Sequence, residues 1–335
     1  MHALLFDLGG TYLRAGVTGP DGTLANTAKT RIRSIADGLA EDAIWPRVAN
    51  RILDYESEQR SAVPPNAPVV ISFPGPVTNR RRVLQAPTVA GGSTKVFDLA
   101  AAVEQGTGRR VLLLNDVSAA AWRLAETTTA RRFMVVTVSS GVGSKIFDRC
   151  HPSGVLDQPA YSGEIGHVVV DDSSSAPVCD CGGRGHLGAI ASGRGIERCA
   201  RRRAAVRRRE FEASKMKRDF GAMPQTLNNE EHLAPALLAG DPWALKIVSD
   251  CTRPLARVLL SVAMAVGLDR VFLIGGFAQA LGNRYVEIMR DLAVEISRYE
   301  PVRDQLDSLF ESGIHEQETC LEGCAAFLRH MRTAL

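Results

Sequence analysis

The hydrophobic positions of the chain form short runs that end in glycine or proline. The segment ALLFDLGGTYLRAGV predicts a strand, a glycine turn and a second strand, and Asp21-Gly22 predicts a hairpin turn before a third. A helical stretch is expected from about Asp37 to Arg60. The segment APVVISFPGPV predicts a buried strand that Pro74 ends. RRVLLLND predicts another buried strand, and the Ala-rich DVSAAAWRLAE after it predicts a helix.

The second half of the chain begins with the same pattern. RRFMVVTVSSGVGSKIFD predicts a strand, a glycine turn and a strand, which indicates two related halves. A long helical region is expected at about 192–266, and DRVFLIGGFAQALG predicts a strand, a glycine pair and the start of a helix. The last stretch, CLEGCAAFLRHMRTAL, predicts a helix. Strands that alternate with helices in this way predict an α/β fold.

Composition limits the classes of protein that remain. The chain has 335 residues, 45% of them hydrophobic, and a single core rarely grows beyond about 250–300 residues, so we expect two lobes. The net charge of +3 argues against a dedicated nucleic-acid-binding protein. No signal peptide and no apolar run of membrane-spanning length is apparent, so a cytoplasmic protein without a membrane partner is expected. Seven cysteines in such a chain favour metal or redox chemistry over a disulfide framework.

The first glycine turn, FDLGGTYLR, has the features of a phosphate-binding loop. Gly9 and Gly10 allow the backbone N–H groups to approach an anion, and Thr11 adds a hydroxyl donor. Asp7, at the end of the strand, could hold a metal-bound water, and Arg14 could reach a phosphate. The same residues are also compatible with a plain hairpin that has glycine in its turn.

Two further strand-to-glycine turns follow. SSGVGSK carries Ser140, Gly141 and Gly143, and it is not a P-loop because Lys145 follows serine. LIGGFA carries Gly275 and Gly276. Three such turns in one chain indicate a single nucleotide held from several sides.

Asn115 and Asp116 stand where a buried strand gives way to a helix. In open α/β sheets this is where ligands bind, and a carboxylate there can accept a proton from a substrate hydroxyl. An adjacent asparagine can hydrogen-bond a neighbouring hydroxyl. The alternative is that Asp116 only caps the helix.

A cysteine-containing loop carries a candidate metal site. His167, Cys179, Cys181 and His186 follow the spacing H-x11-C-x-C-x4-H, and four nitrogen and sulfur ligands suit tetrahedral zinc. A disulfide between Cys179 and Cys181 would be strained. Free thiols, with His167 as an ordinary core histidine, are the alternative.

The order of these motifs resembles the ROK family of bacterial sugar kinases and related repressors. The motifs that carry the resemblance are DLGGTYLR, FPGPV, NDVSAAAWRLAE, SSGVGS, GEIGH, the C-x-C-G-x-x-G loop, SGRG, IGGF and LEGCAAFL, and they span most of the chain. The resemblance implies an α/β actin-like (ribonuclease H-like) sugar kinase fold of two lobes, with the active site in the cleft between them. We expect a smaller lobe at 1–117, joined by a helix at about 318–335, and a larger lobe at 118–317 that holds the zinc loop.

The resemblance also implies a reaction and roles for these residues. The enzyme would transfer the γ-phosphoryl group of ATP, with Mg²⁺, to a sugar hydroxyl, usually the one at C6, and Asp116 would be the general base. Zn²⁺ would be structural, and family members are commonly homodimers. The implied substrate-binding residues are Asn115, Asp116, Glu164, His167, Gly75 and Thr88. The implied ATP- and phosphate-binding residues are Asp7, Gly9, Gly10, Thr11, Arg14, Ser140, Gly141, Gly143, Gly275, Gly276 and Phe277.

The chain departs from the family pattern at several positions. The third cysteine of the family loop is His186, which is still a competent ligand, and the family glutamate that contacts the sugar near its C1–C2 edge is Gly188. Pro87-Thr88 replaces the usual Pro-Asn, and Ser139-Ser140-Gly141 replaces Gly-Thr-Gly. The loss of one carboxylate predicts weak affinity for ordinary glucose, since hydrogen bonds to charged groups contribute about 1.5–3 kcal/mol each.

The departures therefore predict an unusual substrate. We expect an amino sugar such as kanosamine, used in antibiotic biosynthesis, because the Arg/Ala-rich composition is typical of a high-GC bacterium. The alternatives are a C7-cyclitol kinase, a plain glucokinase or N-acetylhexosamine kinase, and a catalytically inactive sugar sensor. A ROK repressor is not expected, because the first motif begins at Asp7. The basic run at 200–210 is interpreted as a solvated helix face, with nucleotide phosphates as the alternative.

Overall fold

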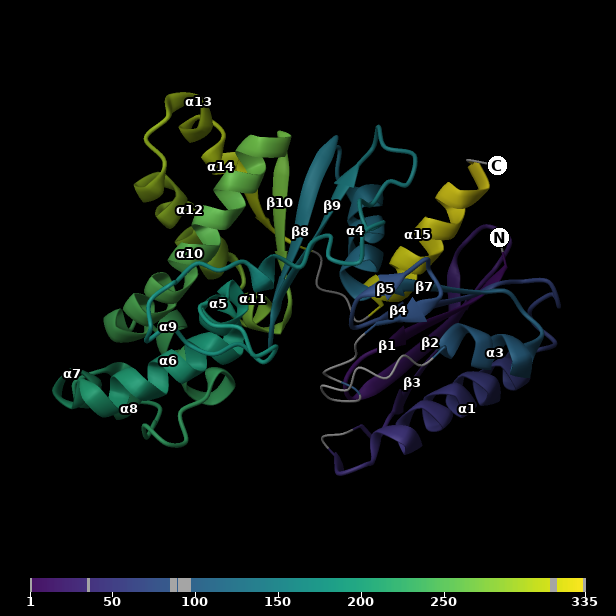
Figure 1. Cartoon of the computed structure of the whole chain (residues 1–335), viewed down its shortest axis with the longest axis horizontal. Coiled ribbons are helices and arrows are strands. Elements are labelled where there is room, and N and C mark those ends of the chain that lie inside the picture. The colour runs from purple at the N-terminus through teal and green to yellow at the C-terminus, as the bar shows by residue number, and fades with distance from the viewer. Residues whose placement is uncertain (1, 35–36, 85–88, 90–97, 314–317, 334–335) are drawn as a thin grey trace. The chain divides into compact units, whose positions relative to one another are not determined.

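The computed structural model describes residues 2–34, 37–84, 89, 98–313 and 318–333. The chain divides into two compact units (Figure 1). The first unit comprises Met1–Thr129, Phe147–Ser162 and Glu316–Leu335, and the second comprises Ala130–Ile146 and Gly163–His315. The lobe boundaries expected from the sequence stay a prediction.

A five-stranded sheet forms the centre of the first unit. Its strands are β1 (Ala3–Leu8), β2 (Tyr12–Thr18), β3 (Leu24–Arg31), β4 (Val69–Phe73) and β7 (Val111–Asn115), in the order β3-β2-β1-β4-β7. The pairs β1–β2 and β2–β3 are antiparallel, the second as the turn at Asp21-Gly22 predicts, whereas β1, β4 and β7 are parallel. The carboxyl ends of β1, β4 and β7 therefore lie along one edge of the sheet. Asp7, Phe73 and Asn115 are at those ends.

Helices cover both faces of this sheet. Residues of α1 (Glu41–Gln59) and α3 (Leu99–Thr107) pack with Leu4, Phe6 and Leu8 in one core cluster. The other pair, α4 (Asp116–Thr127) and α15 (Thr319–Thr333), packs together and against β1 and β4. A Cβ on Gly323 of α15 would lie 1.9 Å from the carbonyl oxygen of Ala119 on α4. The two helix backbones approach this closely only because position 323 is glycine.

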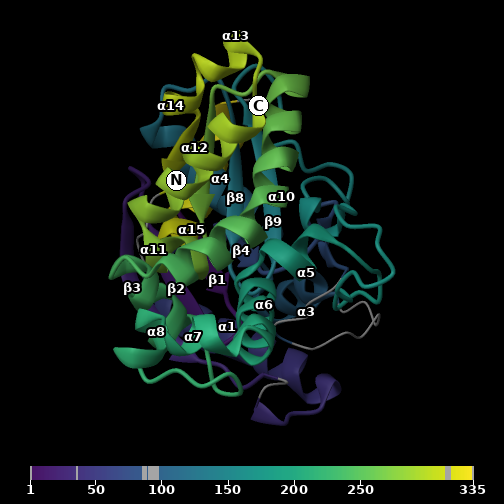
Figure 2. The ribbon, with the colours of Figure 1, turned by 90° about the vertical axis from the view of Figure 1, so that its left-hand side faces the viewer.

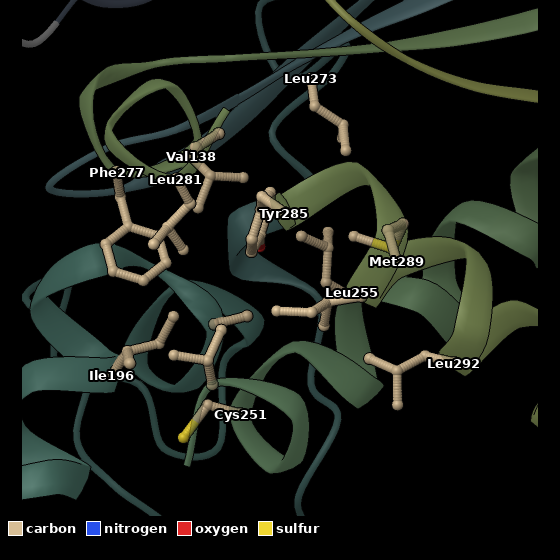
Figure 3. Close-up of a cluster of buried hydrophobic side chains, with 14 of the residues drawn as sticks. Val138, Ile196, Cys251, Leu255, Leu273, Phe277, Leu281, Tyr285, Met289 and Leu292 are labelled. Atoms are coloured by element: carbon tan, nitrogen blue, oxygen red, sulfur yellow. The ribbon is translucent and has the colours of Figure 1, made fainter. Parts of the chain in front are cut away.

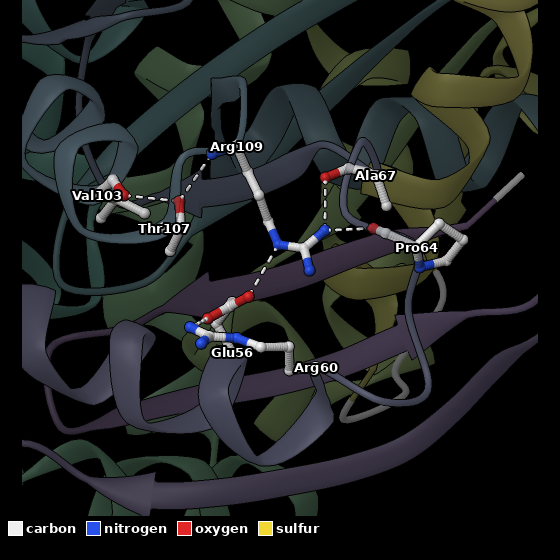
Figure 4. A network of polar contacts seen from close by, with 7 residues as sticks. All are labelled: Glu56, Arg60, Pro64, Ala67, Val103, Thr107 and Arg109. Atoms are coloured by element: carbon white, nitrogen blue, oxygen red, sulfur yellow. Dashed lines mark hydrogen bonds and ion pairs between the residues drawn. The ribbon is translucent and has the colours of Figure 1, made fainter.

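A buried ion pair joins α1 to the start of β7 (Figure 4). Arg109 Nε donates to Glu56 Oε1 at 3.0 Å, and both side chains are 3% exposed. Arg109 also donates to the carbonyl oxygens of Pro64 and Ala67, and Arg60 donates to the second oxygen of Glu56 at 2.9 Å. Burial alone would raise the pKa of Glu56, but the hydrogen bonds from Arg60 and Arg109 lower it below its ordinary value.

The second unit contains a four-stranded sheet. Its strands are β8 (Arg132–Val138), β9 (Val142–Asp148), β10 (Arg270–Ile274) and β11 (Phe310–Ser312), in the order β11-β10-β8-β9. Strand β10 runs parallel to β8 and pairs Ile274 with Thr137. The loops that follow these two strands are therefore neighbours.

The helical region expected at about 192–266 consists of several separate helices. The helices of the second unit are η2 (Ile165–His167), α5 (Leu187–Ala191), α6 (Gly193–Val206), α7 (Arg208–Glu212), α8 (Lys215–Arg218), η3 (Asn229–Leu233), α9 (Ala234–Leu238), α10 (Pro242–Val266), α11 (Gly276–Leu281), α12 (Asn283–Ile296), α13 (Glu300–Arg303) and α14 (Leu306–Leu309). Gly221 and Gly240 take positive φ angles between helices, and Asp241 caps α10 by accepting from Trp243 N at 3.0 Å. These turn and cap residues divide the region.

The core of the second unit lies among these helices. Helix α10 packs along α12, which can be followed in Figure 2. Figure 3 shows side chains of this core, among them Leu255, Phe277 and Tyr285. Within the described part of the chain, no helix has both the length and the apolar character that crossing a membrane would need.

Candidate active site

Asp7 is an anchored carboxylate at the end of β1. Arg14 stands opposite it in the antiparallel register of β1 and β2, and Arg14 Nη1 lies 3.1 Å from Asp7 Oδ2. Ser72 Oγ, on the neighbouring strand β4, donates to Asp7 Oδ1 at 3.0 Å. Burial raises the pKa of Asp7, while Arg14 and Ser72 oppose this increase. The neighbours thus hold the carboxylate in place at the start of the glycine turn.

The glycine turn after Asp7 leaves backbone accessible. Gly9 N donates to the carbonyl oxygen of Tyr12 at 2.8 Å, which closes the turn between β1 and β2. Gly9 and Gly10 are half-buried, and Thr11 is exposed. An anionic ligand can therefore approach this edge of the sheet.

Asn115 connects the start of α4 to the loop after β4. Its Oδ1 accepts from the backbone N–H groups of Val117 and Ser118 at 3.1 and 3.4 Å, which makes it the N-cap of α4. Its Nδ2 donates to the carbonyl oxygen of Gly75 at 2.9 Å. Since Oδ1 is occupied by the cap, one N–H of the amide is left to meet a substrate hydroxyl.

Asp116 is the first residue of α4 and is half-buried. Its Oδ1 accepts from Val117 N at 2.8 Å. Asp116 lies at the positive end of the α4 dipole, and a carboxylate is the form of this side chain that accepts a proton. Asp116 stands at the same sheet edge as Asp7, so the structure brings both carboxylates to the carboxyl ends of parallel strands.

Cys320 on α15 also lies at this edge, and sequence reasoning missed it. Its Sγ is 3.8 Å from the backbone oxygen of Asp116. Burial raises the pKa of the Cys320 thiol well above its ordinary value, and the charges of Asp7 and Asp116 add to the increase. The thiol is therefore protonated beside both carboxylates. Its spacing of one helical turn from Cys324 was the available signal.

Asp157 and Arg80, which sequence reasoning also missed, support the first turn of α4. Asp157 accepts from Ser118 Oγ at 3.0 Å and from Arg80 Nη2 at 3.2 Å, and the Arg80 and Asp157 side chains are 21% and 13% exposed. Arg80 has a φ of +53° in the turn between β5 (Val77–Thr78) and β6 (Arg82–Val83). A positive φ is unfavourable for a residue other than glycine, and the ion pair with Asp157 helps to stabilise Arg80 in this conformation.

In the second unit, the loop after β8 forms an open turn. Ser139 N donates to the carbonyl oxygen of Gly141 at 3.0 Å, and Gly193 N donates to Ser139 O at 2.7 Å. Ser140 and Gly141 are exposed, and a Cβ on Gly141 would meet no atom within 4 Å. Gly143 follows on β9. A phosphate group has room to approach the backbone here.

The glycine pair after β10 packs beside the same loop. Gly275 has a φ of +94°, and a Cβ on it would lie 2.5 Å from Thr137 Oγ1, so this position requires glycine. A Cβ on Gly276 would lie 3.7 Å from Ser139 Oγ. The ring of Phe277 is buried and packs edge-to-face with Tyr285, with ring centroids 5.8 Å apart (Figure 3). The Phe277 side chain therefore belongs to the core of the second unit.

The four expected metal ligands come together in the second unit. One donor atom from each of His167, Cys179, Cys181 and His186 lies within 4.8 Å of all the others. Cys181 Sγ is 3.3 Å from His186 Nδ1, and the two imidazole rings are edge-to-face at 5.5 Å. Two sulfur and two nitrogen donors this close together match the donor set and the number of ligands of a tetrahedral Zn²⁺ site.

Glycines shape the loop that presents the two cysteines. Cys179 N donates to Gly183 O at 2.7 Å, and Gly182 N donates to Cys179 O at 2.8 Å. A Cβ on Gly183 would lie 2.3 Å from a carbon of the His186 ring, so glycine gives this ligand its room. Asp180, between the cysteines, pairs with Arg194 of α6 at 2.8 Å. The ligands are thus preorganised by the backbone of their own loop.

The segment that carries Glu164 and His167 is held between β9 and α5. Gly163 has a φ of +82°, and its carbonyl oxygen accepts from Ser144 N at 2.8 Å. Gly188 on α5 faces this segment, since a Cβ on it would lie 3.2 Å from the carbonyl oxygen of Gly166. The backbone between Glu164 and His167 therefore passes close to position 188, where there is no side chain.

The structure gathers the expected residues into one set in the first unit and two sets in the second. The first unit places Asp7, Gly9, Gly10, Thr11, Arg14, Gly75, Asn115 and Asp116 at one sheet edge. The second unit places Ser140, Gly141 and Gly143 with Gly275, Gly276 and Phe277, and separately gathers the four metal ligands with Glu164. Thr88 lies outside the described residues.

Comparisons with known proteins agree with one another. The ROK family model matches residues 4–330. The chain is 35% identical over 324 residues to the C(7)-cyclitol 7-kinase of Streptomyces hygroscopicus subsp. limoneus, covering 95% of this chain and 91% of that protein. It is 28% identical over 295 residues to the 2-epi-5-epi-valiolone 7-kinase of an Actinoplanes species, covering 85% and 80%. A ROK family glucokinase from Streptomyces griseus, solved with glucose and AMPPNP, matches with a TM-score of 0.68 and 20% identity over 97% of this chain and 98% of that one. This last likeness shows the fold.

Proposed function

The chain belongs to the ROK family, and from this premise we propose that it phosphorylates a C7-cyclitol at its exocyclic hydroxyl. The two-lobed, actin-like α/β fold and the activity of an ATP-dependent phosphotransferase with an alcohol acceptor are those of the family. The identity of the acceptor is the part that this proposal adds. Kanosamine, the amino sugar expected from the sequence, stays a prediction.

Gly188 is the observation that carries the substrate class. Sugar kinases of the family present a glutamate here to the C1–C2 edge of a hexose, whereas this chain presents only backbone, close to Gly166. A cyclitol is a carbocycle without an anomeric centre, so a contact between this glutamate and an anomeric hydroxyl has no counterpart in it. The identities to a cyclitol kinase and a valiolone kinase support the same class.

The residues of the first unit would handle the acceptor. Asp116 would accept the proton of the exocyclic hydroxyl as this oxygen attacks phosphorus, which is the role of a general base. Asn115 would offer its remaining N–H to a neighbouring ring hydroxyl while it keeps the Gly75 loop on the start of α4. In the second unit, Glu164 and His167 would bind further hydroxyls.

The donor would be held by glycine-rich backbone. ATP supplies the phosphoryl group, and Mg²⁺ neutralises charge on its phosphates. Asp7, a carboxylate beside an open glycine turn, has the hard oxygen donors that suit a water of Mg²⁺. Gly9, Gly10 and Thr11 would contact phosphates, as would Ser140 and the loop that contains it. Gly275 and Gly276 would lie at the adenosine.

We further propose that the four clustered donors bind one structural Zn²⁺. Their spacing within 4.8 Å and the glycine-shaped loop support this ligand set. Metal analysis of the purified protein should find about one zinc per chain, and Cys181→Ser should lose it while Cys150→Ser, at an exposed cysteine outside the cluster, keeps it. Equal zinc content in both variants would contradict the site. A homodimeric state, a cytoplasmic location and a role in antibiotic biosynthesis stay predictions.

The decisive experiment is ATP consumption against a panel of acceptors. The panel holds C7-cyclitols, kanosamine, glucosamine, glucose, N-acetylglucosamine and N-acetylmannosamine. We expect selective turnover of a cyclitol, and no turnover by Asp116→Asn, which should still bind the acceptor. Efficient turnover of glucose would overturn the substrate proposal, and activity of Asp116→Asn within a few-fold of the parent would overturn the assignment of the base.

A matched set of variants at position 188 tests the role of the missing carboxylate. Gly188→Glu should improve the KM for glucose at least tenfold, because a hydrogen bond to a charged group contributes about 1.5–3 kcal/mol. Gly188→Gln keeps the size without the charge, and Gly188→Ala adds only the Cβ that would lie 3.2 Å from Gly166 O. Equal effects of all three would show that crowding, and not the carboxylate, sets specificity.

A further inference from the structure

A cavity of about 300 Å³ lies in the first unit, away from the residues assigned above. It is lined by α4, by α15 and by the segment 147–154, all of which belong to that unit. The two helices pack side by side (Figure 1). A cavity of this size is at the lower end of the range for small-molecule sites.

Aromatic side chains form one wall of this cavity. Trp122 of α4 is 4% exposed and packs edge-to-face with Phe147, with ring centroids 5.0 Å apart. The ring of His330 on α15 lies 4.6 Å from that of Trp122, and His330 Nε2 donates to the carbonyl oxygen of Pro152 at 3.0 Å. A Cβ on Gly154 would lie 2.5 Å from Cη2 and 2.8 Å from Cζ2 of Trp122. The edge of the indole that carries Cζ2 therefore faces the glycine in the cavity lining.

The indole N–H of Trp122 has no acceptor. Within the described part of the chain, Nε1 is buried and makes no hydrogen bond. Nε1 and Cζ2 are bonded to the same ring carbon, so the N–H group belongs to the edge of the indole that faces Gly154. Buried indole N–H groups usually find a partner, because leaving one unpaired costs free energy. An oxygen atom of a ligand in the cavity would supply the acceptor.

The charged groups of the lining favour an acceptor that is negatively charged. Among the described residues that line the cavity are two guanidinium groups, of Arg149 and Arg329, and one carboxylate, of Glu126. Arg329 Nε donates to Glu126 Oε1 at 2.9 Å, whereas Arg149 Nη2 donates to the uncharged carbonyl oxygens of Ala125 and Thr128. The lining thus carries one more positive than negative charge when His330 is neutral. Hydrogen bonds and contacts to such a set are stronger for an anionic oxygen than for a neutral one.

We propose that this cavity binds a small organic anion that carries a planar ring. The ring would pack against Trp122 and Phe147, and an anionic oxygen of a phosphate or carboxylate group would accept from Trp122 Nε1 beside Arg149 and Arg329. Such a ligand contacts α4 and α15 together, so its binding stabilises the folded first unit. The inference concerns binding alone and does not depend on the proposed acceptor of the phosphoryl group.

The test is a titration of the whole protein, labelled with ¹⁵N at tryptophan, with phenyl phosphate. The chain has three tryptophans, at positions 45, 122 and 243, and loss of a signal in Trp122→Phe assigns the indole resonance of Trp122. We expect the Trp122 N–H resonance to shift while those of Trp45 and Trp243 stay, and the Tm to rise. Inorganic phosphate lacks the ring, phenol lacks the charge and benzylamine has the opposite charge, so each should bind at least about tenfold more weakly by calorimetry.

Two variants and a matched control locate the ligand. Trp122→Phe keeps a ring but removes the N–H, and should raise the Kd about 3–10-fold. Glu126→Gln removes the carboxylate of an ion pair whose side chains are 40% and 35% exposed, and should lower the Kd about two- to fivefold. Glu104→Gln, which removes the carboxylate of the Arg81–Glu104 pair outside the cavity, should leave the Kd unchanged.

Three outcomes would overturn the proposal. The first is a Trp122 resonance that stays in place at millimolar phenyl phosphate. The second is an equal Kd for the parent and Trp122→Phe, which would place the ligand elsewhere. The third is binding of benzylamine, phenol or inorganic phosphate as tight as that of phenyl phosphate, which would contradict the class of ligand.

Discussion

The close approach of α15 to α4 makes a single methyl group a sensitive probe of the first unit. In Gly323→Ala, the added Cβ would lie 1.9 Å from the carbonyl oxygen of Ala119, 2.5 Å from its carbonyl carbon and 3.1 Å from its Cα. All three are backbone atoms of a helix, so no rotamer change can relieve the overlap. To reach an ordinary contact of 3.4 Å, the two helices must separate by about 1.5 Å.

The magnitude follows from two opposing contributions. Alanine stabilises a helix interior over glycine by about 1 kcal/mol, whereas inserting a methyl group into a close-packed contact costs about 1–3 kcal/mol or more. A separation of this size also weakens the dispersion contacts along the interface, because a gap of about 0.5–1 Å already loses a quarter to a half of each. We expect a net loss of about 2 kcal/mol, which lowers the Tm by roughly 4–8 °C.

Thermal unfolding and steady-state kinetics check this reasoning together. The first residue of α4 is Asp116, and displacement of a reacting group by about 1 Å can reduce turnover about 100-fold, so kcat should fall in Gly323→Ala along with the Tm. The control is Gly106→Ala on α3, where the Cβ would meet the methyl groups of Leu53 at 2.5 and 2.8 Å, and these can move. A Gly323→Ala protein as stable and active as Gly106→Ala would refute the argument.

Two further substitutions test buried charge in the first unit. The pKa of Glu56 is lowered in the fold, so its ion pair with Arg109 stabilises the folded state above the ordinary pKa of 4.5, and this stabilisation is lost as the pH falls through the lower folded value. Glu56→Gln should therefore lower the Tm at pH 7 but reduce the further loss of Tm as the pH falls below 4.5. Parallel Tm–pH curves for variant and parent would contradict this. Asp157→Asn should lower the Tm by several degrees at pH 7, since it leaves Arg80 and Ser118 without their shared acceptor charge, and an unchanged Tm would show that the network contributes little.

The local hydrophobic pattern of the sequence predicts the strands around the first glycine turn and the turn that joins them. The alternation around Asp7 and the glycine pair predicts β1 and β2 with the turn that the structure shows, and the helix expected from Asp37 to Arg60 corresponds to α1 at Glu41–Gln59. The helical region expected at about 192–266 is built from several helices, whose boundaries the sequence pattern did not give. Hydrophobic periodicity marks which positions are buried but reports poorly where one buried helix ends and the next begins, because caps such as Asp241 are single residues.

The candidate site shows a similar limit. Asn115 and Asp116 were identified because a strand-to-helix junction is a local feature of the sequence. Cys320 beside Asp116, and Asp157 beneath Ser118, come from segments far away in the chain, and no spacing in the sequence connects them. Tertiary packing alone sets these neighbours.

The first unit is built from three separate segments of the chain, and this affects how it can fold during biosynthesis. As the ribosome releases the chain from the N-terminus, the sheet of the first unit and α4 emerge early, but α15, which covers them, emerges only after the second unit. Until residues 319–333 are available, the apolar face of α4 around Ala119 lacks the cover that α15 provides, although Trp122 already has Phe147 as a partner. The nascent first unit should therefore mature last although it is made first, and premature termination before α15 should yield a product that depends on chaperones and is a substrate for proteases.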